Sequence, residues 1–471
     1  MPEADLFGDR NIIRVTEPFI IKGGRFRQPA KALRCRLILS PRALRQPREV
    51  AFQVHAHRHL RRVQAVLAED QPAVARKKMF RKTFPKRNDY PERLDQIGFQ
   101  YHRLPSSDGE PYWTEGVAYQ FTLAEIDEIE AVSAELHEIC LETVGAIIES
   151  GDYPNEFGLS EQSKSLIENS WRNDDFHIYS RFDLLVEPSG AIKMYEYNAD
   201  TPTALLESAV AQWQWLEEAE NVPHRDQFNS IHEKLIARWQ EAKGDLINPM
   251  LYVLAAKEGL FEDWGNIEYI AETALQGGWQ VHLEEIENVG YNHEKREFVD
   301  AAENSIEFAF KLYPWEWMME EEFGANVLTS PTVWFEPPWK MLLSNKAILP
   351  VLWKRYPEHP NLSPSFFENE KPAVSFQYMY VKKPILGREG ANIQLAGTFS
   401  DNLLDGSHQT AEYEGNGYIY QQYAPLPDFQ GKHPLIGSWI IGDEPAGIGI
   451  REDNTIVTGN GSHFVPHYFI D

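Results

Sequence analysis

Two carboxylates, an amide and an arginine alternate along residues 177–198 in a pattern suited to a metal site. They are Arg181, Asp183, Glu196 and Asn198. Carboxylate and amide oxygens suit Mg²⁺, which binds few carboxylates, keeps several waters and bridges substrate phosphates. The same residue types also fit a surface hairpin in which Arg181 and Glu196 form only a cross-strand ion pair. Both interpretations remain open at this point.

Two strands must bring these side chains together. The stretch HIYSRFDLLVEPSGAIKMYEYN is typical of two strands around a turn at residues 188–190. If Glu187 pairs with Gly190, Arg181 lies opposite Glu196. Side chains two apart on a strand share a face, and diagonal neighbours lie ~7–8 Å apart or less. We therefore expect the four polar side chains to converge on one face of the hairpin.

A second set of residues could bind phosphate. Lys346 lies near the start of an expected helix, Lys383 ends an expected strand, Arg388 and Gly390 lie in the Gly-rich turn after it, and Arg451 follows AGIGI. Gly-bounded turns let backbone N–H groups approach phosphate oxygens, where Lys supplies a point charge and Arg a fork. Each signal is weak alone. No Walker A or dinucleotide glycine motif competes with them.

The elements around these residues predict an α/β or α+β fold. Thr122 and Glu125 form a capping box for a long amphipathic helix that Gly151 can end. Further helices are expected over about 202–220 and 344–356. Residues 249–285 are typical of a strand–helix–strand unit of an open sheet. The segments SFQYMYVKKP, GYIYQQY, PLIGSWII and AGIGIRE predict an antiparallel sheet in the C-terminal third.

Charge is distributed unevenly along the 471 residues. Residues 1–78 carry 17 Lys+Arg against 7 Asp+Glu, whereas the remainder carries 28 against 64, within a net charge of −26. An acidic body argues against a nucleic-acid enzyme, because phosphate backbones need clustered cations. The basic segment could be a nucleic-acid or membrane arm, a poorly ordered appendage, or sequence upstream of a translation start at Met79. Its alternating His55, His57 and His59 have no supporting metal ligands nearby.

The remaining composition predicts a cytoplasmic protein. No apolar run reaches the ~18 residues of a membrane-spanning helix. The basic N-terminus is not followed by the apolar stretch of a secretory signal. Cys35 and Cys140 are far apart in the chain, so neither a disulfide framework nor a cysteine metal site is indicated.

Five blocks of the chain resemble the glutathionylspermidine synthase ATP-grasp domain. They are RFDLLVEPSGAIKMYEYNADTPTALLESAVAQWQWLE, EPPWKMLLSNKAILPVLW, YVKKPILGREGANI, YIYQQYAPLPDF and GSWIIGDEPAGIGIRED. The resemblance covers residues 88–470 and is closest to short acid–amine ligases without an amidase domain. It implies a basic extension over 1–87 and a ligase domain over 88–471. The implied fold is a circularly permuted ATP-grasp-like one, with an open-sheet α/β substrate lobe and an antiparallel nucleotide lobe.

The resemblance also implies residue roles. Arg181 resembles the arginine that stabilises the transferring phosphoryl group. The implied Mg²⁺ ligands are Asp183, Glu196 and Asn198. The implied ATP contacts are Arg181, Asp183, Lys346, Lys383, Arg388, Gly390, Gln421, Gln422 and Arg451. The positions near the acid substrate are Thr201 and Thr203.

The implied activity is an ATP- and Mg²⁺-dependent acid–amine ligation. The acid's carboxylate attacks the γ-phosphate, an acyl phosphate forms, and an amine displaces phosphate to give an amide. Small-molecule acids and amines would be the partners, with neither nucleic acid nor membrane involved. Two alternatives remain: an ATP-binding regulatory module without ligase activity, and a phosphotransferase that stops at the phosphorylated acid. Glutathione and a polyamine are implied as substrates only by analogy.

Overall fold

The computed structural model describes residues 79–471 except 188–189, 224–225, 258–260, 371–378, 397–401, 405, 412, 414 and 460. The chain divides into two units, Met1–Arg76 and Lys77–Asp471, and the described residues belong to the second. The expectations for the basic segment and its three histidines lie outside the described residues. Within the described residues, no helix combines the length and hydropathy that would let it cross a bilayer.

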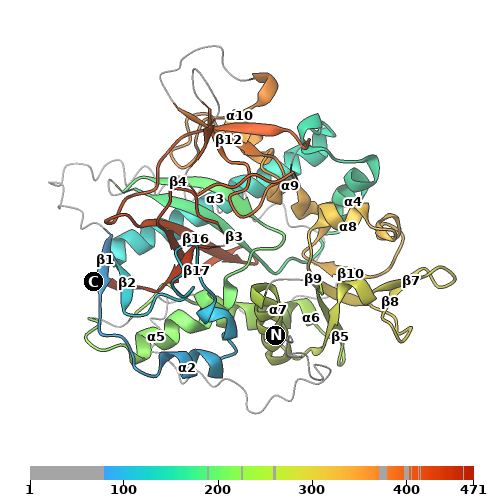
Figure 1. The fold of residues 1–471 in the computed structure, drawn as a ribbon. Helices are drawn as coiled ribbons and strands as arrows, with labels where there is room; N and C mark the ends of the chain where they lie inside the picture. Colours follow the sequence, from blue (N-terminus) through green and yellow to red (C-terminus); the bar gives the residue numbers. More distant parts are fainter. Residues whose placement is uncertain are drawn as a thin grey trace, which may run out of the picture. The chain divides into compact units, whose positions relative to one another are not determined.

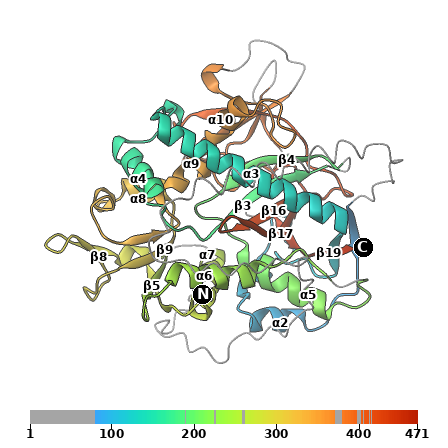
Figure 2. The same cartoon turned by 180° about the vertical axis from the view of Figure 1, so that it is seen from behind.

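A five-stranded antiparallel sheet carries the predicted metal hairpin (Figure 1). Its order is β18 (His463–Val465), β17 (Glu444–Asp453), β16 (His433–Ile441), β3 (Tyr179–Val186) and β4 (Ile192–Asn198). The helix α3 (Leu123–Ser150) packs against β16 and β17 and is the long helix that crosses this sheet in Figure 2. This sheet is therefore covered by the amphipathic helix that the sequence predicts.

The ends of α3 lie where its capping residues place them. The Thr122 hydroxyl accepts a hydrogen bond from the Glu125 backbone N–H, and the Glu125 carboxylate accepts one from the Thr122 N–H. Gly151 ends the helix in the left-handed region, at φ +68°. Buried residues that include Ile129 and Leu136 join the apolar core beneath the helix. The predicted capping box and termination are confirmed.

A four-stranded parallel sheet forms the open α/β unit. Its order is β10 (Val333–Phe335), β9 (Phe308–Leu312), β5 (Met250–Ala255) and β6 (Gln280–Glu285). The helix α7 (Phe261–Gln276) joins β5 to β6 and packs on α6 (Ile231–Lys243). The strand–helix–strand unit expected over 249–285 is confirmed, and β9 and β10 extend it.

A second five-stranded antiparallel sheet carries Lys383. Its order is β11 (Ser365–Phe367), β15 (Tyr418–Gln422), β12 (Tyr380–Pro384), β13 (Gln394–Ala396) and β14 (Asn402–Leu403). The predicted strands GYIYQQY, PLIGSWII and AGIGIRE are thus β15, β16 and β17, and YVKKP is β12. All pair antiparallel, as expected for the C-terminal third.

The residues before α3 form more regular structure than the sequence indicates. The strand β1 (Phe80–Thr83) pairs with β2 (Val117–Thr122), which in turn pairs with the C-terminal β19 (His467–Ile470). Residues 80–87, which the resemblance left to the N-terminal extension, therefore belong to the folded unit. Arg81 joins β1 to the rest of this unit, because its guanidinium binds both carboxylate oxygens of Glu452 at 2.9 and 2.7 Å.

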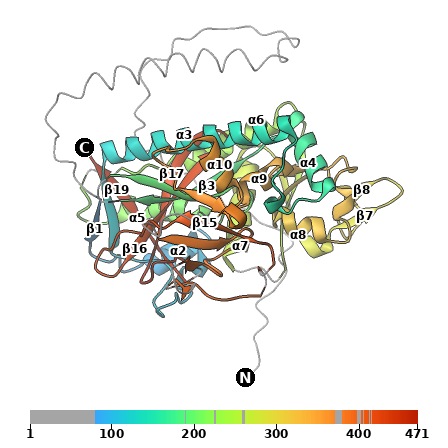
Figure 3. The same cartoon turned by 90° about the horizontal axis from the view of Figure 1, so that it is seen from above.

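Shorter elements complete the described chain. The helices are α2 (Tyr90–Gln96), α4 (Glu161–Arg172), α5 (Gln212–Glu218), α8 (Trp315–Glu320), α9 (Met341–Ser344) and α10 (Ile348–Arg355). A two-stranded ribbon consists of β7 (Gly290–Asn292) and β8 (Glu297–Val299). Figure 3 shows α3 alongside β3, β17 and α10 from another side.

Two expected helices differ in detail. The helix expected near 202–220 contains a π-helical turn, η3 (Glu207–Ala211), before α5. The one expected over 344–356 begins later, as α10, and the short helix α9 precedes it. The side chain of Asn345 favours the break between them, because its Oδ1 accepts the Ala347 N–H at 2.9 Å and so offers the backbone an alternative to helix pairing. Lys346 lies in the resulting break.

Candidate functional site

The predicted register of the metal hairpin is wrong, but the predicted convergence is confirmed. Asp183 lies opposite Glu196, and Arg181 lies opposite Asn198. The expected pair of Arg181 with Glu196 does not form. Directly paired residues project from the same side of a sheet, so the four side chains still share one face.

Two single-residue shifts explain the difference. Glu187 pairs with Ala191 rather than Gly190, with its backbone N–H 2.8 Å from the Ala191 carbonyl oxygen. A β-bulge between Asp183 and Leu184 then shifts the register again, because a bulge sets two residues of one strand against one of the other. A single one-residue shift would place the polar side chains of β4 on the face opposite to those of β3. The second shift returns them to the same face.

Every residue that the sequence predicts for the site lines one cavity of about 540 Å³. Its wall is built from β3, β4, β12, β15 and β17 and from the loops that follow β4, β9 and β12. The thirteen predicted residues that line it are Arg181, Asp183, Glu196, Asn198, Thr201, Thr203, Lys346, Lys383, Arg388, Gly390, Gln421, Gln422 and Arg451. Residues from sequence positions 181 to 451 thus meet at one place.

Asp183 lies between two guanidinium groups. The Arg181 Nε lies 2.8 Å from its Oδ1, and Arg451 Nη2 lies 2.7 Å from its Oδ2. Arg181 also donates through Nη1 to the carbonyl oxygen of Thr203 at 2.6 Å and stacks over the Trp439 ring. These contacts fix the plane of a buried arginine beside the cavity, which preorganises its donors for an anionic group.

Glu196 faces the two lysines. The Lys346 Nζ lies 3.0 Å from its Oε2, and the Asn198 amide donates to its Oε1 at 3.2 Å. Burial alone would raise the pKa of Glu196, but the charges of Lys346 and Lys383 outweigh that effect and lower this pKa to about 2. Glu196 therefore stays ionised at physiological pH and balances part of the lysine charge.

Lys383 lies on β12, and residues of β15 and β4 contact its ammonium group. Its ammonium donates to Gln421 Oε1 at 2.7 Å, and its Nζ lies 5.1 Å from the centre of the Tyr195 ring. Burial lowers the pKa of Lys383 to about 8. Gln421 in turn donates to the carbonyl oxygen of Met194 at 3.2 Å, so β15 positions the lysine through a glutamine bound to β4.

The Gly-rich loop after β12 approaches the cavity closely. Lys346 donates to the carbonyl oxygen of Gly387 at 2.6 Å. Gly390 has φ +73°, and a Cβ there would lie 2.6 Å from Val457 Cγ1. Both its conformation and its space therefore require glycine. The absence of a side chain lets the loop pack directly against Val457 and Thr458, which also line the cavity.

Arg388 connects this loop to the open α/β unit. Its Nη2 donates to Glu316 on α8 at 3.0 Å, and its Nη1 donates to the Thr201 hydroxyl at 3.2 Å. The guanidinium lies 5.0 Å from the centre of the Trp317 ring. Glu316 and Trp317 also line the cavity. No local sequence pattern identifies Glu316 and Trp317, because the residue they contact, Arg388, lies more than 70 residues away in the chain.

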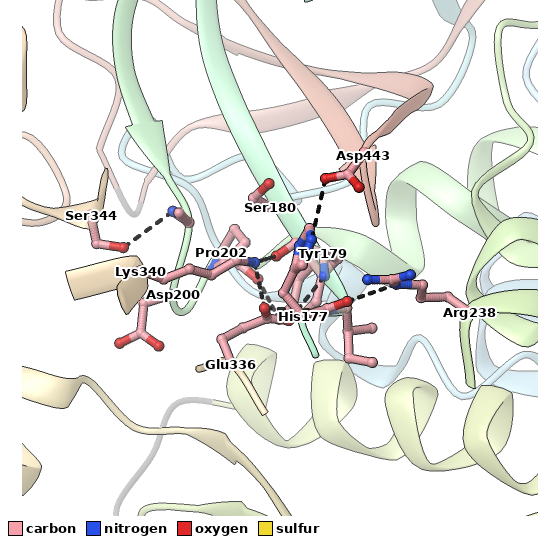
Figure 4. Close-up of polar contacts among 12 residues, drawn as sticks. His177, Tyr179, Ser180, Asp200, Pro202, Arg238, Glu336, Lys340, Ser344 and Asp443 are labelled. Carbon is pink, nitrogen blue, oxygen red and sulfur yellow. Dashed lines mark hydrogen bonds and ion pairs between the residues drawn. The ribbon is translucent and has the colours of Figure 1, made fainter. Parts of the chain in front are cut away.

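Buried polar contacts fix the start of β3 (Figure 4). Glu336 accepts the backbone N–H groups of Ile178 and Tyr179 and forms an ion pair with Lys340. Lys340 donates to the Tyr179 carbonyl oxygen at 2.7 Å. The EPPWK segment therefore clamps the strand that carries Arg181. Sequence reasoning placed EPPWK in a family block but gave these two residues no role.

A second buried ion pair fixes the loop after β4. Asp200 lies 2.7 Å from the Lys311 ammonium and accepts the Trp315 backbone N–H at 3.0 Å. Both side chains of the pair are almost fully buried. Breaking such a pair leaves an uncompensated charge, so the loop that carries Thr201 and Thr203 is tied firmly to β9.

The residues present fit a magnesium ion only together with a phosphorylated ligand. In the described part of the chain, no cluster of three His, Cys, Asp or Glu side chains has metal-binding geometry. The predicted set contributes two carboxylates and one amide. Mg²⁺ is commonly held by one or two carboxylates plus substrate phosphates and waters. Asn198 uses its Nδ2 on Glu196, which leaves its amide oxygen available as a ligand.

The structure combines a mixed α/β fold with a cavity lined by paired carboxylates, lysines, arginines and a Gly-bounded loop. Enzymes that handle phosphate groups use such groups. The sequence profile described as "Glutathionylspermidine synthase preATP-grasp" matches residues 81–470. The chain belongs to the glutathionylspermidine synthase family. The profile covers nearly all of the described unit.

Relatives in this family are named as carbon–nitrogen ligases. A Haemophilus influenzae protein named "Putative acid--amine ligase" is 49% identical over 82% of this chain and 98% of its own length. Trypanothione synthetase of Crithidia fasciculata is 27% identical over 71% of this chain and 54% of its own. The Escherichia coli bifunctional glutathionylspermidine synthetase/amidase is 25% identical over 74% and 59%, respectively. The chain thus matches little more than half the length of the latter two.

Proposed function

We propose that this protein is an ATP-dependent ligase that joins a carboxylic acid to an amine through an acyl phosphate. The observation that carries the proposal is the convergence of thirteen predicted residues, from positions 181 to 451 of the chain, on one cavity of about 540 Å³. Cationic side chains, carboxylates and a Gly-bounded loop in one enclosure meet the main need of phosphoryl transfer, which is to position and neutralise phosphate oxygens.

In the proposed mechanism, Lys346, Lys383 and the loop around Gly390 hold the phosphates of ATP. Asp183, Glu196 and Asn198 would hold Mg²⁺, which supplies charge neutralisation at the phosphate oxygens when it is bound. Arg181 donates to the phosphoryl group as it passes to the acid's carboxylate.

The amide forms in a second step, when the amine attacks the acyl phosphate and releases phosphate. An acyl phosphate hydrolyses in water, so the loop after Lys383 has to exclude solvent. The contacts of Arg388 with Glu316 and Thr201 support that role, because they hold the loop against the opposite wall of the cavity.

The acid and the amine are small molecules in this proposal. Glutathione and spermidine are reasonable first probes because the E. coli relative is a glutathionylspermidine synthetase by name. Thr201 and Thr203 line the cavity beside Arg388 and Arg181, where an acid's carboxylate would meet the transferring phosphoryl group.

Mass spectrometry on complete reactions tests the proposal. The full chain is incubated with ATP, Mg²⁺, a pool of small carboxylic acids that includes glutathione and a pool of primary amines that includes spermidine. A ligase gives ADP, phosphate and a new amide in equal amounts. A phosphotransferase gives a phosphorylated acid without an amine, and a regulatory module turns over no ATP; either result would exclude the ligase.

A further inference from the structure

Glu207 is a fully buried carboxylate without a cationic partner. It lies on the π-helical turn η3, and its Oε1 accepts a hydrogen bond from the Tyr112 hydroxyl at 2.8 Å. Its Oε2 is buried and unbonded beside the equally buried, unbonded hydroxyl of Tyr101. Among the residues that the structure describes, no Lys, Arg or His forms an ion pair with it. Buried carboxylates are ordinarily paired, so an orphaned one calls for an explanation.

Tyr112 connects this carboxylate to the cavity. Its side chain lines the cavity wall together with Thr203, Glu262 and Asp263. Its backbone is held on both sides: its N–H donates to the Leu104 carbonyl oxygen at 2.9 Å, and its carbonyl oxygen accepts the Phe464 N–H at 2.8 Å. Tyr112 thus has a fixed backbone at the cavity wall, and its hydroxyl donates to the buried Glu207.

The backbone that leads from the Arg181 contact to Glu207 is unusual at two points. Thr203 accepts the Arg181 hydrogen bond through its carbonyl oxygen, and Ala204 follows with φ +67°. A non-glycine residue in this region is strained, and π-helical turns are frequent at functional sites. Both features lie close in the chain to Thr203, whose carbonyl oxygen contacts Arg181 at the proposed site of phosphoryl transfer.

We propose that Tyr112 and Glu207 form a proton relay that serves the amine in the second half of the reaction. This inference rests on the proposed ligase function. Tyr112 contacts the amine directly, and Glu207 is a positioning residue that acts through the tyrosine hydroxyl.

The step balances without any further reactant. The amine enters as an ammonium and first gives one proton to the Tyr112 oxygen, while the hydroxyl's own proton passes to Glu207 Oε1. The freed nitrogen lone pair then forms the C–N bond at the acyl carbon, and the C–O bond to phosphate breaks with its electron pair leaving on phosphate. The phosphate takes the second nitrogen proton and leaves as hydrogen phosphate. Glu207 ends the step protonated and returns the proton to solvent before the next cycle.

The surrounding charges suit a relay. Burial, with the neighbouring charge of Glu262 on α7, raises the pKa of Glu207 to about 8. Burial and Glu207 raise the pKa of Tyr112 well above its ordinary value, an effect that Arg451 on β17 opposes. The other titratable group beside Glu207 is the buried Tyr101. Tyr112 therefore passes a proton without becoming a tyrosinate, and Glu207 becomes an ionised acceptor as the pH rises through about 8.

The test compares two nucleophiles in the full chain. Glu207→Gln and Tyr112→Phe are assayed with ATP, Mg²⁺ and the acid pool, first with spermidine and then with hydroxylamine. Spermidine is mostly protonated near neutral pH, as a Lys side chain is with its pKa of ~10.4, so it needs a proton acceptor. Hydroxylamine is uncharged there and traps an acyl phosphate as a hydroxamate without such help.

Both variants should lose ~10²-fold or more of the amide-forming rate, the usual worth of general base catalysis, and keep the hydroxamate-forming rate. The rising limb of the wild-type pH profile near pH 8 should disappear in Glu207→Gln. Tyr119→Phe is the matched control, because Tyr119 makes the same kind of bond to Glu452 at 2.8 Å but does not line the cavity. It should retain both rates.

The possible outcomes separate the two proposals. An equal loss of both rates, or an unchanged amide-forming rate, would overturn the relay while leaving the ligase intact. A wild-type chain that forms neither hydroxamate nor amide would overturn both. Melting curves of each variant check that any loss is not due to unfolding.

Discussion

Arg181 holds Asp183 with two guanidinium nitrogens, since Nε lies 2.8 Å from Oδ1 and Nη2 lies 3.3 Å from Oδ2. The two residues are neighbours on one face of β3. The same guanidinium is packed over Gly437 of β16, where a Cβ would lie 2.8 Å from Arg181 Cδ. An arginine fixed in this way loses little further entropy when it binds a ligand, which is the physical advantage of a preorganised site.

Arg181→Lys should lower kcat far more than it weakens ATP binding. Lysine keeps the charge but loses the planar fork, and loss of such a group in phosphoryl transfer can reach ~10³-fold or more. Removing an interaction made only in the transition state lowers kcat and kcat/KM together. Steady-state kinetics with ADP release as the readout, plus a melting curve, check this.

Arg238→Lys is a matched control for that experiment. Arg238 is also partly buried, stacks 3.6 Å from the centre of the Phe176 ring and donates to the His177 carbonyl oxygen, but it does not line the cavity. Its kcat should stay near wild type. If Arg181→Lys changed only the KM for ATP, Arg181 would be a ground-state phosphate contact; no kinetic change would remove it from the active site.

Asp183→Asn, Glu196→Gln and Asn198→Ala should each reduce MgATP turnover strongly while the protein remains folded. Each change removes a proposed ligand or weakens its charge, and the three side chains share one face of the β3–β4 hairpin. Glu444→Gln, an exposed change on β17, should leave turnover unchanged. Turnover measured against Mg²⁺ concentration checks the result, and wild-type behaviour in all three variants contradicts the assignment.

A chain that begins at Met79 should be folded and active. Met79 is buried in the apolar core, and the compact unit begins at Lys77. A chain that begins at Pro85 should melt at a lower temperature, because it loses β1 and both hydrogen bonds of Arg81 to Glu452. Solubility, melting temperature and ATP turnover are the measurements. Loss of activity on removing only residues 1–78 would show that they contribute to the site.

The KM for ATP should rise as the pH increases above about 8. Burial lowers the pKa of Lys383 to about 8, so in the free protein the ammonium is charged below that pH and loses its proton above it. A neutral amine attracts phosphate weakly, so affinity falls until the pH reaches the higher pKa of the ATP-bound lysine.

Lys383→Arg should flatten that dependence, since arginine stays charged throughout this range. The KM for ATP measured from pH 7 to 10 in both proteins provides the comparison. The same rise in both would assign the pH dependence to another group. Lys432→Arg, a change at a lysine that does not line the cavity, serves as the control for a general effect of the substitution.

The sequence by itself determined the local elements that carry the predicted site residues. Thr122, Glu125 and Gly151 specify both ends of α3, because capping groups act within one helical turn. The alternation in β3 and β4 fixed which side chains share a face, since the period of a strand is two residues. These interactions connect residues close together in the chain, so a local pattern contains them.

Only the tertiary structure decided how the cavity is closed and what lies behind its wall. The Arg388–Glu316 contact, the clamp of Glu336 and Lys340 on β3, and the Tyr112–Glu207 pair join segments 72 to 161 residues apart. The packing of sheets against helices, rather than spacing along the chain, determines which residues form these contacts. The tertiary structure also decided the exact register of the β3–β4 hairpin. The bulge after Asp183 depends on how β3 pairs between β4 and β16.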